Sequence, residues 1–358
     1  MTGEVRIRTH GGVGQLSLDR PRALNALTLA MCEEMSAALL AWRDDPAVQA
    51  VIIDHAPTPE GAEKPSRGFC AGGDVAMVRT SALADGGAAG RVFFRAEYRL
   101  NHLLFAYPKP IVAFMDGVTM GGGVGIALPA RYRVATENTL FAMPEGAIGL
   151  FPDVGAGWYL RRLPGQIGKF LALTGARLDG AECLWAGVAT HYCAASSLSE
   201  VKSRIAANPQ EIAQILGEFS DTSPPARLTR NAEKIDGLFA PDTLEGIIAA
   251  LTADSSEWAA KELKAVTSKC PTSGKVALRQ FAENASLTDF ADEMALEYRL
   301  AARMLMRADF AEGVRAVLVD KDNAPRWDPA TPEGVTPAML DAIFAALPAG
   351  EEWTPFPA

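Results

Sequence analysis

The chain has few cysteines and histidines, and it has no surplus of basic residues. Its five cysteines form no C-x-x-C pair, which fits reduced thiols in a cytosolic protein better than a disulfide framework. The four histidines are isolated, so no pair has the spacing of metal ligands and no metal is expected. Because 43 acidic residues outnumber 34 Lys and Arg, the net charge of −9 argues against a nucleic-acid partner.

Several common sequence signals are also missing. The first residues lack the basic and apolar regions of a secretory signal peptide. No apolar run reaches the roughly 18 residues that a membrane-spanning helix needs. The absence of a G-x-S-x-G elbow disfavours a Ser-His-Asp hydrolase, and the absence of a P-loop lysine and of a G-x-G-x-x-G run disfavours a nucleotide loop. We therefore expect a cytoplasmic protein with no membrane partner.

The order of apolar and turn residues predicts an α/β core followed by a mostly helical part. A hairpin turning at Gly11 and Gly12 is expected first, and Thr28 is expected to cap a helix over residues 28–42. Further predictions are strands over 48–56 and 110–117, a loop over 57–68, helices over 89–105, 256–269 and 288–307, and a loose tail over 348–358. We predict a core over residues 1–195 and a helical extension over 196–358 that packs on it.

Two glycine motifs leave backbone N–H groups available to a ligand. In "FCAGGDV" (residues 69–75), adjacent glycines follow an expected strand; the alternative is an ordinary turn in which Asp74 caps the next helix. In "MGGGVGIAL" (residues 120–128), three glycines open an expected helix and suit a developing oxyanion. The alternative there is close helix–strand packing that only glycine permits. Cys70 is a possible nucleophile, but a buried filler is the favoured interpretation.

Two carboxylates follow the second glycine motif, each directly after a proline. Glu145 lies in "MPEG" and Asp153 in "FPDVGAG". Proline fixes φ, so each acid is held on a defined loop, where paired carboxylates can do acid/base work. The alternatives are a solvated loop acid for Glu145 and a helix N-cap for Asp153.

Four motifs in order, "RPRALNALT", "FCAGGDV", "DGVTMGGGVG" and "FAMPEGAIGLFPDVGAGWYLRRL", resemble the enoyl-CoA hydratase/isomerase (crotonase) superfamily over roughly residues 5–195. This resemblance implies a spiral of ββα units that binds acyl-CoA thioesters. It also implies an oxyanion hole made by the backbone N–H groups of Gly73 and Gly122. By the same resemblance, CoA runs along Ala23, Leu24 and Ala26, and along the backbone near Ala71 and Asp74.

One position separates the branches of this superfamily. Hydratases use two glutamates; the second matches Glu145, but the first falls at Gly125, which has no side chain for proton chemistry. The chain instead resembles the 3-hydroxyisobutyryl-CoA hydrolase branch, through "FFRAEY", "LTGARLDGAECLWAGVATHY" and "DFAEGVRAVLVDKDNAPRWDP". That likeness implies substrate-binding or catalytic roles for Glu97, Gly122, Glu145 and Asp153. From its residue pattern alone, Glu97 would be interpreted as part of a solvated helix face.

The resemblance implies hydrolysis of a short 3-hydroxyacyl-CoA, most readily 3-hydroxyisobutyryl-CoA, as in valine catabolism, with no cofactor besides the CoA of the substrate. Glu145 would act as nucleophile or as general base, and Asp153 would orient the substrate or pass a proton to the CoA thiolate. Three alternatives stay open: a hydratase or isomerase that uses Glu145 alone, hydrolysis of another short acyl-CoA, and a non-catalytic acyl-CoA-binding subunit. We expect the helical part to cover the acyl pocket or to mediate self-association as a homo-oligomer.

Overall fold

The computed structural model describes residues 3–57 and 68–357, so the loop predicted over 57–68 lies almost entirely outside the described residues. The chain forms two compact units, each assembled from three segments. Unit 1 consists of Met1–Gly73, Arg99–Phe141 and Arg177–Arg227, and unit 2 of Asp74–Tyr98, Ala142–Ala176 and Leu228–Ala358. The division predicted at residue 195 stays a prediction.

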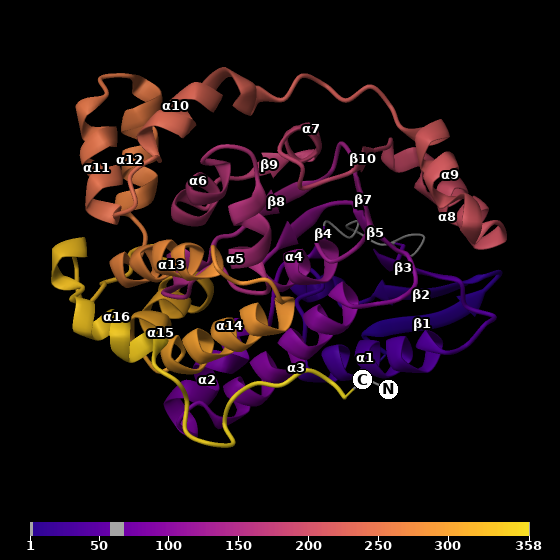
Figure 1. Ribbon diagram of the computed structural model, residues 1–358, viewed down its shortest axis with the longest axis horizontal. Coiled ribbons are helices and arrows are strands. Elements are labelled where there is room, and N and C mark those ends of the chain that lie inside the picture. Colours follow the sequence, from indigo (N-terminus) through magenta and orange to yellow (C-terminus); the bar gives the residue numbers. More distant parts are fainter. Residues whose placement is uncertain (1–2, 58–67, 358) are drawn as a thin grey trace. The chain divides into compact units, whose positions relative to one another are not determined.

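Unit 1 contains two sheets (Figure 1). The first has the order β1-β2-β3-β5-β7-β10, and only its β1–β2 pair is antiparallel. Its strands are β1 (Val5–His10), β2 (Val13–Leu18), β3 (Ala50–His55), β5 (Ile111–Met115), β7 (Tyr132–Ala135) and β10 (His191–Tyr192). The second sheet has the order β4-β6-β8-β9, with β4 (Gly68–Cys70), β6 (Val118–Met120), β8 (Leu140–Ala142) and β9 (Leu178–Asp179).

The first sheet is buried by helices that follow it in the chain. Strands β3 and β5 are almost continuously apolar, as strands covered on both faces should be. Ile52 and Phe114 belong to a core that also includes Val201 and Ile205 of α8 (Leu198–Ala207) and Ile215 of α9 (Ile212–Phe219). The predicted hairpin is confirmed, because β1 and β2 pair in register from Val5–Leu18 to His10–Val13.

The helices agree with the predicted pattern. Thr28 caps α1 (Leu29–Arg43) by accepting a hydrogen bond from the Met31 amide at 3.3 Å. Unit 1 also holds α4 (Gly122–Ala127), α7 (Gly180–Trp185) and the end of α3 (Ala88–Phe105). Unit 2 holds the start of α3 and the helices α2 (Val75–Ala84), α5 (Ala156–Tyr159), α6 (Ile167–Thr174), α10 (Ala232–Leu238), α11 (Leu244–Ala253), α12 (Glu257–Thr267), α13 (Pro271–Asn284), α14 (Phe290–Met304), α15 (Ala308–Val314) and α16 (Pro337–Phe344).

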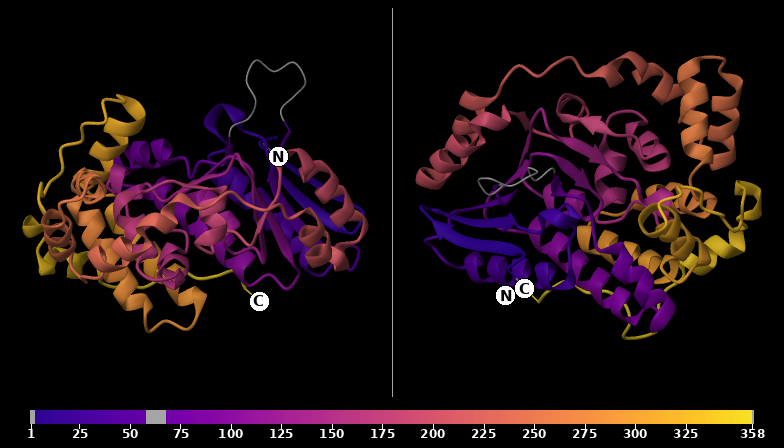
Figure 2. Two further views of the ribbon diagram at one scale, coloured as in Figure 1. Left: turned by 90° about the horizontal axis from the view of Figure 1, so that it is seen from above. Right: turned by 180° about the vertical axis from the view of Figure 1, so that it is seen from behind.

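The part of the chain after β10 is helical, as predicted: residues 193–357 contain no strand. Helices α12 and α14 match two of the predicted amphipathic stretches, and α11 and α12 lie side by side as a helical hairpin (Figures 1 and 2). The prediction of a loose tail is wrong. Trp353 is buried and its indole N–H donates to the Arg95 carbonyl at 3.3 Å, while Glu352 pairs with Arg299 at 2.9 Å.

The second glycine of helix α4 marks a very close approach of two backbones. A Cβ added at Gly123 would lie 2.1 Å from the Cys70 carbonyl oxygen of strand β4. Backbone atoms cannot yield as a flexible side chain can, so only glycine fits at this position. The close-packing interpretation of the glycine run is therefore confirmed at Gly123.

We expect Gly123→Ala to lower the free energy of unfolding by about 1–3 kcal/mol, the usual cost of overpacking. Urea denaturation measures this loss. Gly217→Ala in α9 is the matched control in the same unit, because an added Cβ there meets nothing within 4 Å. That control should be neutral or up to about 1 kcal/mol more stable, as alanine favours helix. Equal stability of the two variants would contradict the packing argument.

Candidate active site

The two predicted glycine loops lie next to each other in unit 1. A Cβ added at Gly72 would be 3.5 Å from the Met120 carbonyl oxygen and 3.7 Å from the Gly122 nitrogen. Within the described residues, neither the Gly73 amide nor the Gly122 amide donates a hydrogen bond to another backbone group. The two N–H groups predicted to form an oxyanion hole are thus uncommitted and come from neighbouring turns.

The segment predicted to line CoA is fixed to the same glycine turn. Leu24 lies in the left-handed region with φ of 49°, and its carbonyl accepts a hydrogen bond from the Ala71 amide at 3.0 Å. Ala26 donates to the Ala23 carbonyl, and Leu27 donates to the Gly72 carbonyl at 2.8 Å. Unit 1 therefore brings together Ala23, Leu24, Ala26, Ala71, Gly73 and Gly122, which are far apart in sequence.

The remaining residues of the glycine motifs have structural partners or no side chain. Asp74, the first residue of unit 2, accepts a hydrogen bond from the Met77 amide at 3.2 Å and caps α2, the alternative considered for it. Cys70 is buried and its thiol donates to the Gly72 carbonyl at 3.6 Å, which agrees with the filler interpretation. Gly125 lies inside α4, and this position has no side chain that could transfer a proton.

Unit 2 gathers the three predicted acids in its interior. Glu97 is on α3, Glu145 begins a 3-10 turn (Glu145–Ile148), and Asp153 is on the loop before α5. Their exposed fractions are 2%, 5% and 4%. The alternatives of a solvated loop acid for Glu145 and a solvated helix face for Glu97 are therefore wrong. Asp153 is not an N-cap either, since Gly155 occupies that position.

Asp153 differs from its two neighbours in having a strong donor. The Tyr98 hydroxyl donates to Asp153 Oδ2 at 2.7 Å, and both side chains are buried. Burial raises the pKa of Asp153 to about 6, and this hydrogen bond opposes the rise. Burial and the charge of Asp153 also raise the pKa of Tyr98 well above its usual value, so Tyr98 remains a proton donor.

The environment of Glu97 and Glu145 favours their neutral forms. Oε1 of Glu97 and Oε2 of Glu145 have no hydrogen-bond partner among the described residues. Burial raises the pKa of each carboxyl well above its usual value, and the charge of Asp153 raises it further. Asp153, with the Tyr98 donor, is therefore the acid of the three whose ionisation is best supported.

Sequence reasoning missed the residues that support these acids. Tyr98 stands beside Glu97 in a motif that was already identified, so its hydroxyl could have been considered. Glu293 and Glu297 on α14 are also buried, and Gln280 of α13 donates to Glu297 at 2.9 Å. Acids four residues apart normally repel each other on an exposed helix face, and that repeat was the available signal.

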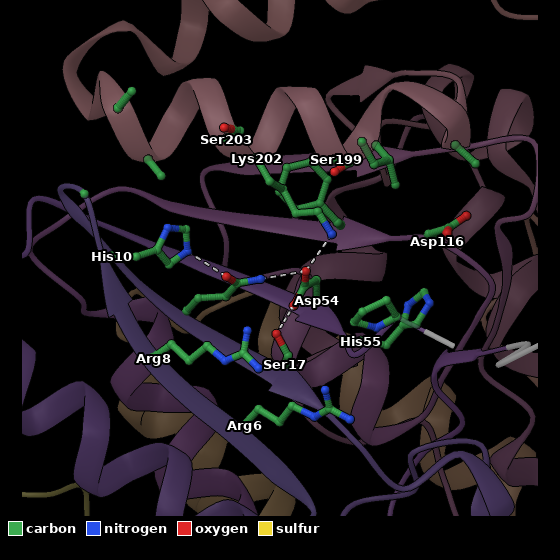
Figure 3. A pocket seen from close by; sticks show the side chains of 18 residues that line it. Arg6, Arg8, His10, Ser17, Asp54, His55, Asp116, Ser199, Lys202 and Ser203 are labelled. Atoms are coloured by element: carbon green, nitrogen blue, oxygen red, sulfur yellow. Dashed lines mark hydrogen bonds and ion pairs between the residues drawn. The ribbon is translucent and has the colours of Figure 1, made fainter. Parts of the chain in front are cut away.

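A separate cavity of about 650 Å³ lies in unit 1, and it contains none of the predicted site residues (Figure 3). Its centre is Asp54, which accepts hydrogen bonds from Ser17 at 2.6 Å, from Gln15 at 2.9 Å and from Lys202 at 2.7 Å (Figure 3). These polar groups therefore satisfy one another. No cluster of three or more potential metal ligands occurs in residues 3–57 and 68–357, and no helix there has the length and apolar character to cross a bilayer.

The spiral of mostly parallel strands, the adjoining glycine turns and the helical second half are those of the crotonase fold. The sequence matches the family model described as Enoyl-CoA hydratase/isomerase over residues 13–344. The chain belongs to the enoyl-CoA hydratase/isomerase family.

The curated relatives that are similar in sequence are 3-hydroxyisobutyryl-CoA hydrolases, whereas the similar solved structures are a dehydratase and a hydratase. The chain is 42% identical to 3-hydroxyisobutyryl-CoA hydrolase, mitochondrial, of Gallus gallus, over 96% of this chain and 89% of that protein, and 41% identical to the Homo sapiens protein of that name with the same coverage. A carnitinyl-CoA dehydratase from Mycobacterium thermoresistibile has a TM-score of 0.90 at 38% identity, covering 98% of both chains. An enoyl-CoA hydratase from Rhodobacter sphaeroides has a TM-score of 0.86 at 39% identity, covering 98% of this chain and 99% of that one.

We expect Tyr98→Phe to raise the pKa of Asp153 above about 6, because the hydrogen bond that stabilises its carboxylate is lost. Titration of the Asp153 carboxyl by carbon-13 NMR in aspartate-labelled protein measures the shift. Tyr298→Phe is the matched control: its ring is 6.5 Å from that of Tyr98, and its hydroxyl accepts from Arg95. An unchanged Asp153 titration in Tyr98→Phe would contradict the assigned role of Tyr98.

Proposed function

We propose that this protein is an acyl-CoA thioester hydrolase that converts a short 3-hydroxyacyl-CoA, most readily 3-hydroxyisobutyryl-CoA, to the free acid and CoA. The observation that carries the proposal is the identity of about 40% to hydrolases of that name over nearly the whole chain. Two features of the chain support it. Glycine stands at position 125, where hydration would need a glutamate, and Asp153 supplies a second buried acid beside Glu145.

In this proposal backbone N–H groups of unit 1 bind the carbonyl oxygen of the thioester. The N–H groups of Gly73 and Gly122 donate to the carbonyl oxygen as it gains negative charge, and each such donor is typically worth about 10²–10³ in rate. Ala23, Leu24, Ala26 and the backbone at Ala71 contact CoA. Since the Asp74 side chain caps α2, its backbone is the part available for such a contact.

Two routes are consistent with the acids of unit 2. In one, the Glu145 carboxylate attacks the carbonyl carbon and forms a tetrahedral intermediate. The C–S bond of this intermediate breaks, CoA leaves as the thiolate, and water cleaves the mixed anhydride that remains. In the other, Glu145 removes a proton from the attacking water, and the tetrahedral intermediate expels the thiolate directly. In both routes Asp153 orients the substrate as a carboxylate; to pass a proton to the departing thiolate it would first take up the proton that Glu145 loses. Glu97 contributes to substrate binding.

The raised pKa of Glu145 in the free protein affects both routes. Burial and the charge of Asp153 raise the pKa of Glu145 well above its usual value, so ionisation of Glu145 is unfavourable in the free protein. Either route therefore begins with loss of the Glu145 proton, and activity should increase with pH through the raised pKa of Glu145.

A second candidate is hydration or isomerisation of an enoyl-CoA with Glu145 as the only base. It is favoured by the similarity to two proteins of known structure, a carnitinyl-CoA dehydratase at 38% identity and an enoyl-CoA hydratase at 39% identity. Double-bond migration requires a single base, so Gly125 does not exclude it.

The proposal extends to the setting of the enzyme. We propose a cytoplasmic location, supported by five free and buried cysteines, whereas the vertebrate relatives are named mitochondrial. We also propose that the protein uses no cofactor besides the CoA of its substrate, and that it self-associates as a homo-oligomer. Fractionation of the source cells and sedimentation of the purified protein test the location and the assembly.

The experiment offers purified protein 3-hydroxyisobutyryl-CoA and crotonyl-CoA separately, and follows thiol release and alkene loss. We expect thiol release from the first compound and little alkene loss from the second. Glu145→Gln should lower thiol release by about 10³-fold or more, because a positioned base or nucleophile is lost. Equilibrium binding of free CoA, which lacks the acyl group, serves as the control for folding.

Each other outcome has a definite meaning. Alkene loss without thiol release would select the hydratase, and thiol release only from another acyl-CoA would change the substrate. Binding of both compounds without either reaction would indicate a non-catalytic subunit. Full hydrolysis by Glu145→Gln would contradict the residue assignment while leaving the activity correct.

A further inference from the structure

The turn that carries Asp153 has an unfavourable backbone. Val154 and Gly155 have positive φ in succession, 57° and 90°. The left-handed region is unfavourable for a β-branched residue such as valine and typically costs about 1–3 kcal/mol. A turn of this kind keeps its shape only when surrounding groups hold it.

Glu297 of α14 is the side chain that holds this turn. Its Oε2 accepts a hydrogen bond from the Gly155 amide at 2.7 Å, and its Oε1 accepts one from Gln280 of α13 at 2.9 Å. Glu297 is completely buried. The bond joins two segments 142 residues apart in sequence, so α14 reaches directly to the loop of Asp153.

The turn packs closely against residues of α13 and α14. A Cβ added at Gly157 would lie 2.5 Å from both Asn284 Nδ2 and Glu293 Oε1, and one added at Gly155 would lie 2.9 Å from the ring of Phe290. Glycine at both positions lets the backbone sit directly against α13 and α14. A displacement of the turn would therefore have to begin with loss of the Glu297 bond.

We propose that Glu297 is a positioning residue for Asp153, which fixes the reacting geometry by holding the Val154–Gly155 turn through the Gly155 amide. The proposal rests on the proposed function in one respect, namely that Asp153 takes part in the reaction. A buried carboxyl is costly compared with an apolar side chain of similar length. What Glu297 provides in return is an acceptor for the Gly155 amide, which a methionine would leave unpaired.

The test compares substitutions at two buried acids of unit 2. Glu297→Met removes the acceptor, and Glu297→Gln retains an oxygen for the Gly155 amide. Glu262→Met is the matched control, because Glu262 is also buried but lies on α12 and forms its ion pair with Lys261 of the same helix, at 3.3 Å. Glu297→Asp, whose shorter side chain cannot reach the amide, replaces Glu297→Met if the latter does not fold.

We expect Glu297→Met or Glu297→Asp to lower kcat about 10–100-fold, since a misplacement near 1 Å can cost that much. KM should stay within about threefold, because the CoA contacts proposed above come mainly from unit 1, and Glu297→Gln should restore kcat to within about threefold. An equal loss of kcat in Glu262→Met, or a retained kcat in Glu297→Met, would overturn the proposal.

Hydrogen exchange separates this proposal from the proposed function. Deuterium uptake over residues 150–160, measured by mass spectrometry, should increase in Glu297→Met and stay at the wild-type level in Glu297→Gln and Glu262→Met. If wild-type protein released no thiol, the proposed function would fail while the exchange data still decided the role of Glu297. Unchanged exchange in Glu297→Met would refute that role.

Discussion

The burial of several carboxyl groups with few hydrogen-bond donors is the constraint on which unit 2 depends. A desolvated carboxylate is stable only where donors or charges replace water, and otherwise the group keeps its proton. The Tyr98 hydroxyl gives Asp153 such a donor, whereas Glu97 and Glu145 each have an oxygen without one. The result is a set of acids that differ in how readily they ionise, which acid/base chemistry requires.

This arrangement has a cost in stability that the rest of unit 2 must offset. When folding raises the pKa of an acid, the free energy of unfolding falls as pH rises from the unfolded pKa to the folded pKa. In that range the acid ionises in the unfolded chain and stays protonated in the folded one. Burial raises the pKa values of Glu97, Glu145 and Glu297, so each of these acids contributes to the loss of stability. Packing between α5, α13 and α14, including the glycine contacts at 155 and 157, stabilises the unit in spite of them.

Local sequence patterns predicted the elements well and the site in part. The hairpin at Gly11, the Thr28 cap and the acids that follow Pro144 and Pro152 are encoded within a few residues, so sequence is enough to find them. Burial is not local: Glu97 is buried because segments distant in sequence pack around it. Tyr98, Glu297 and the fixed position of Trp353 were missed because their partners are 55, 142 and 258 residues away.

Infrared spectroscopy of the carboxyl groups at neutral pH tests the central claim most directly. Protonated carboxyls absorb separately from carboxylates, and spectra of Glu97→Gln and Glu145→Gln subtracted from the wild-type spectrum assign the absorption. The account predicts a protonated-carboxyl band in the wild type that weakens in each variant, with the contribution of Asp153 mainly in the carboxylate region. A wild-type spectrum with carboxylate bands alone would contradict it, because desolvation would then not control these acids.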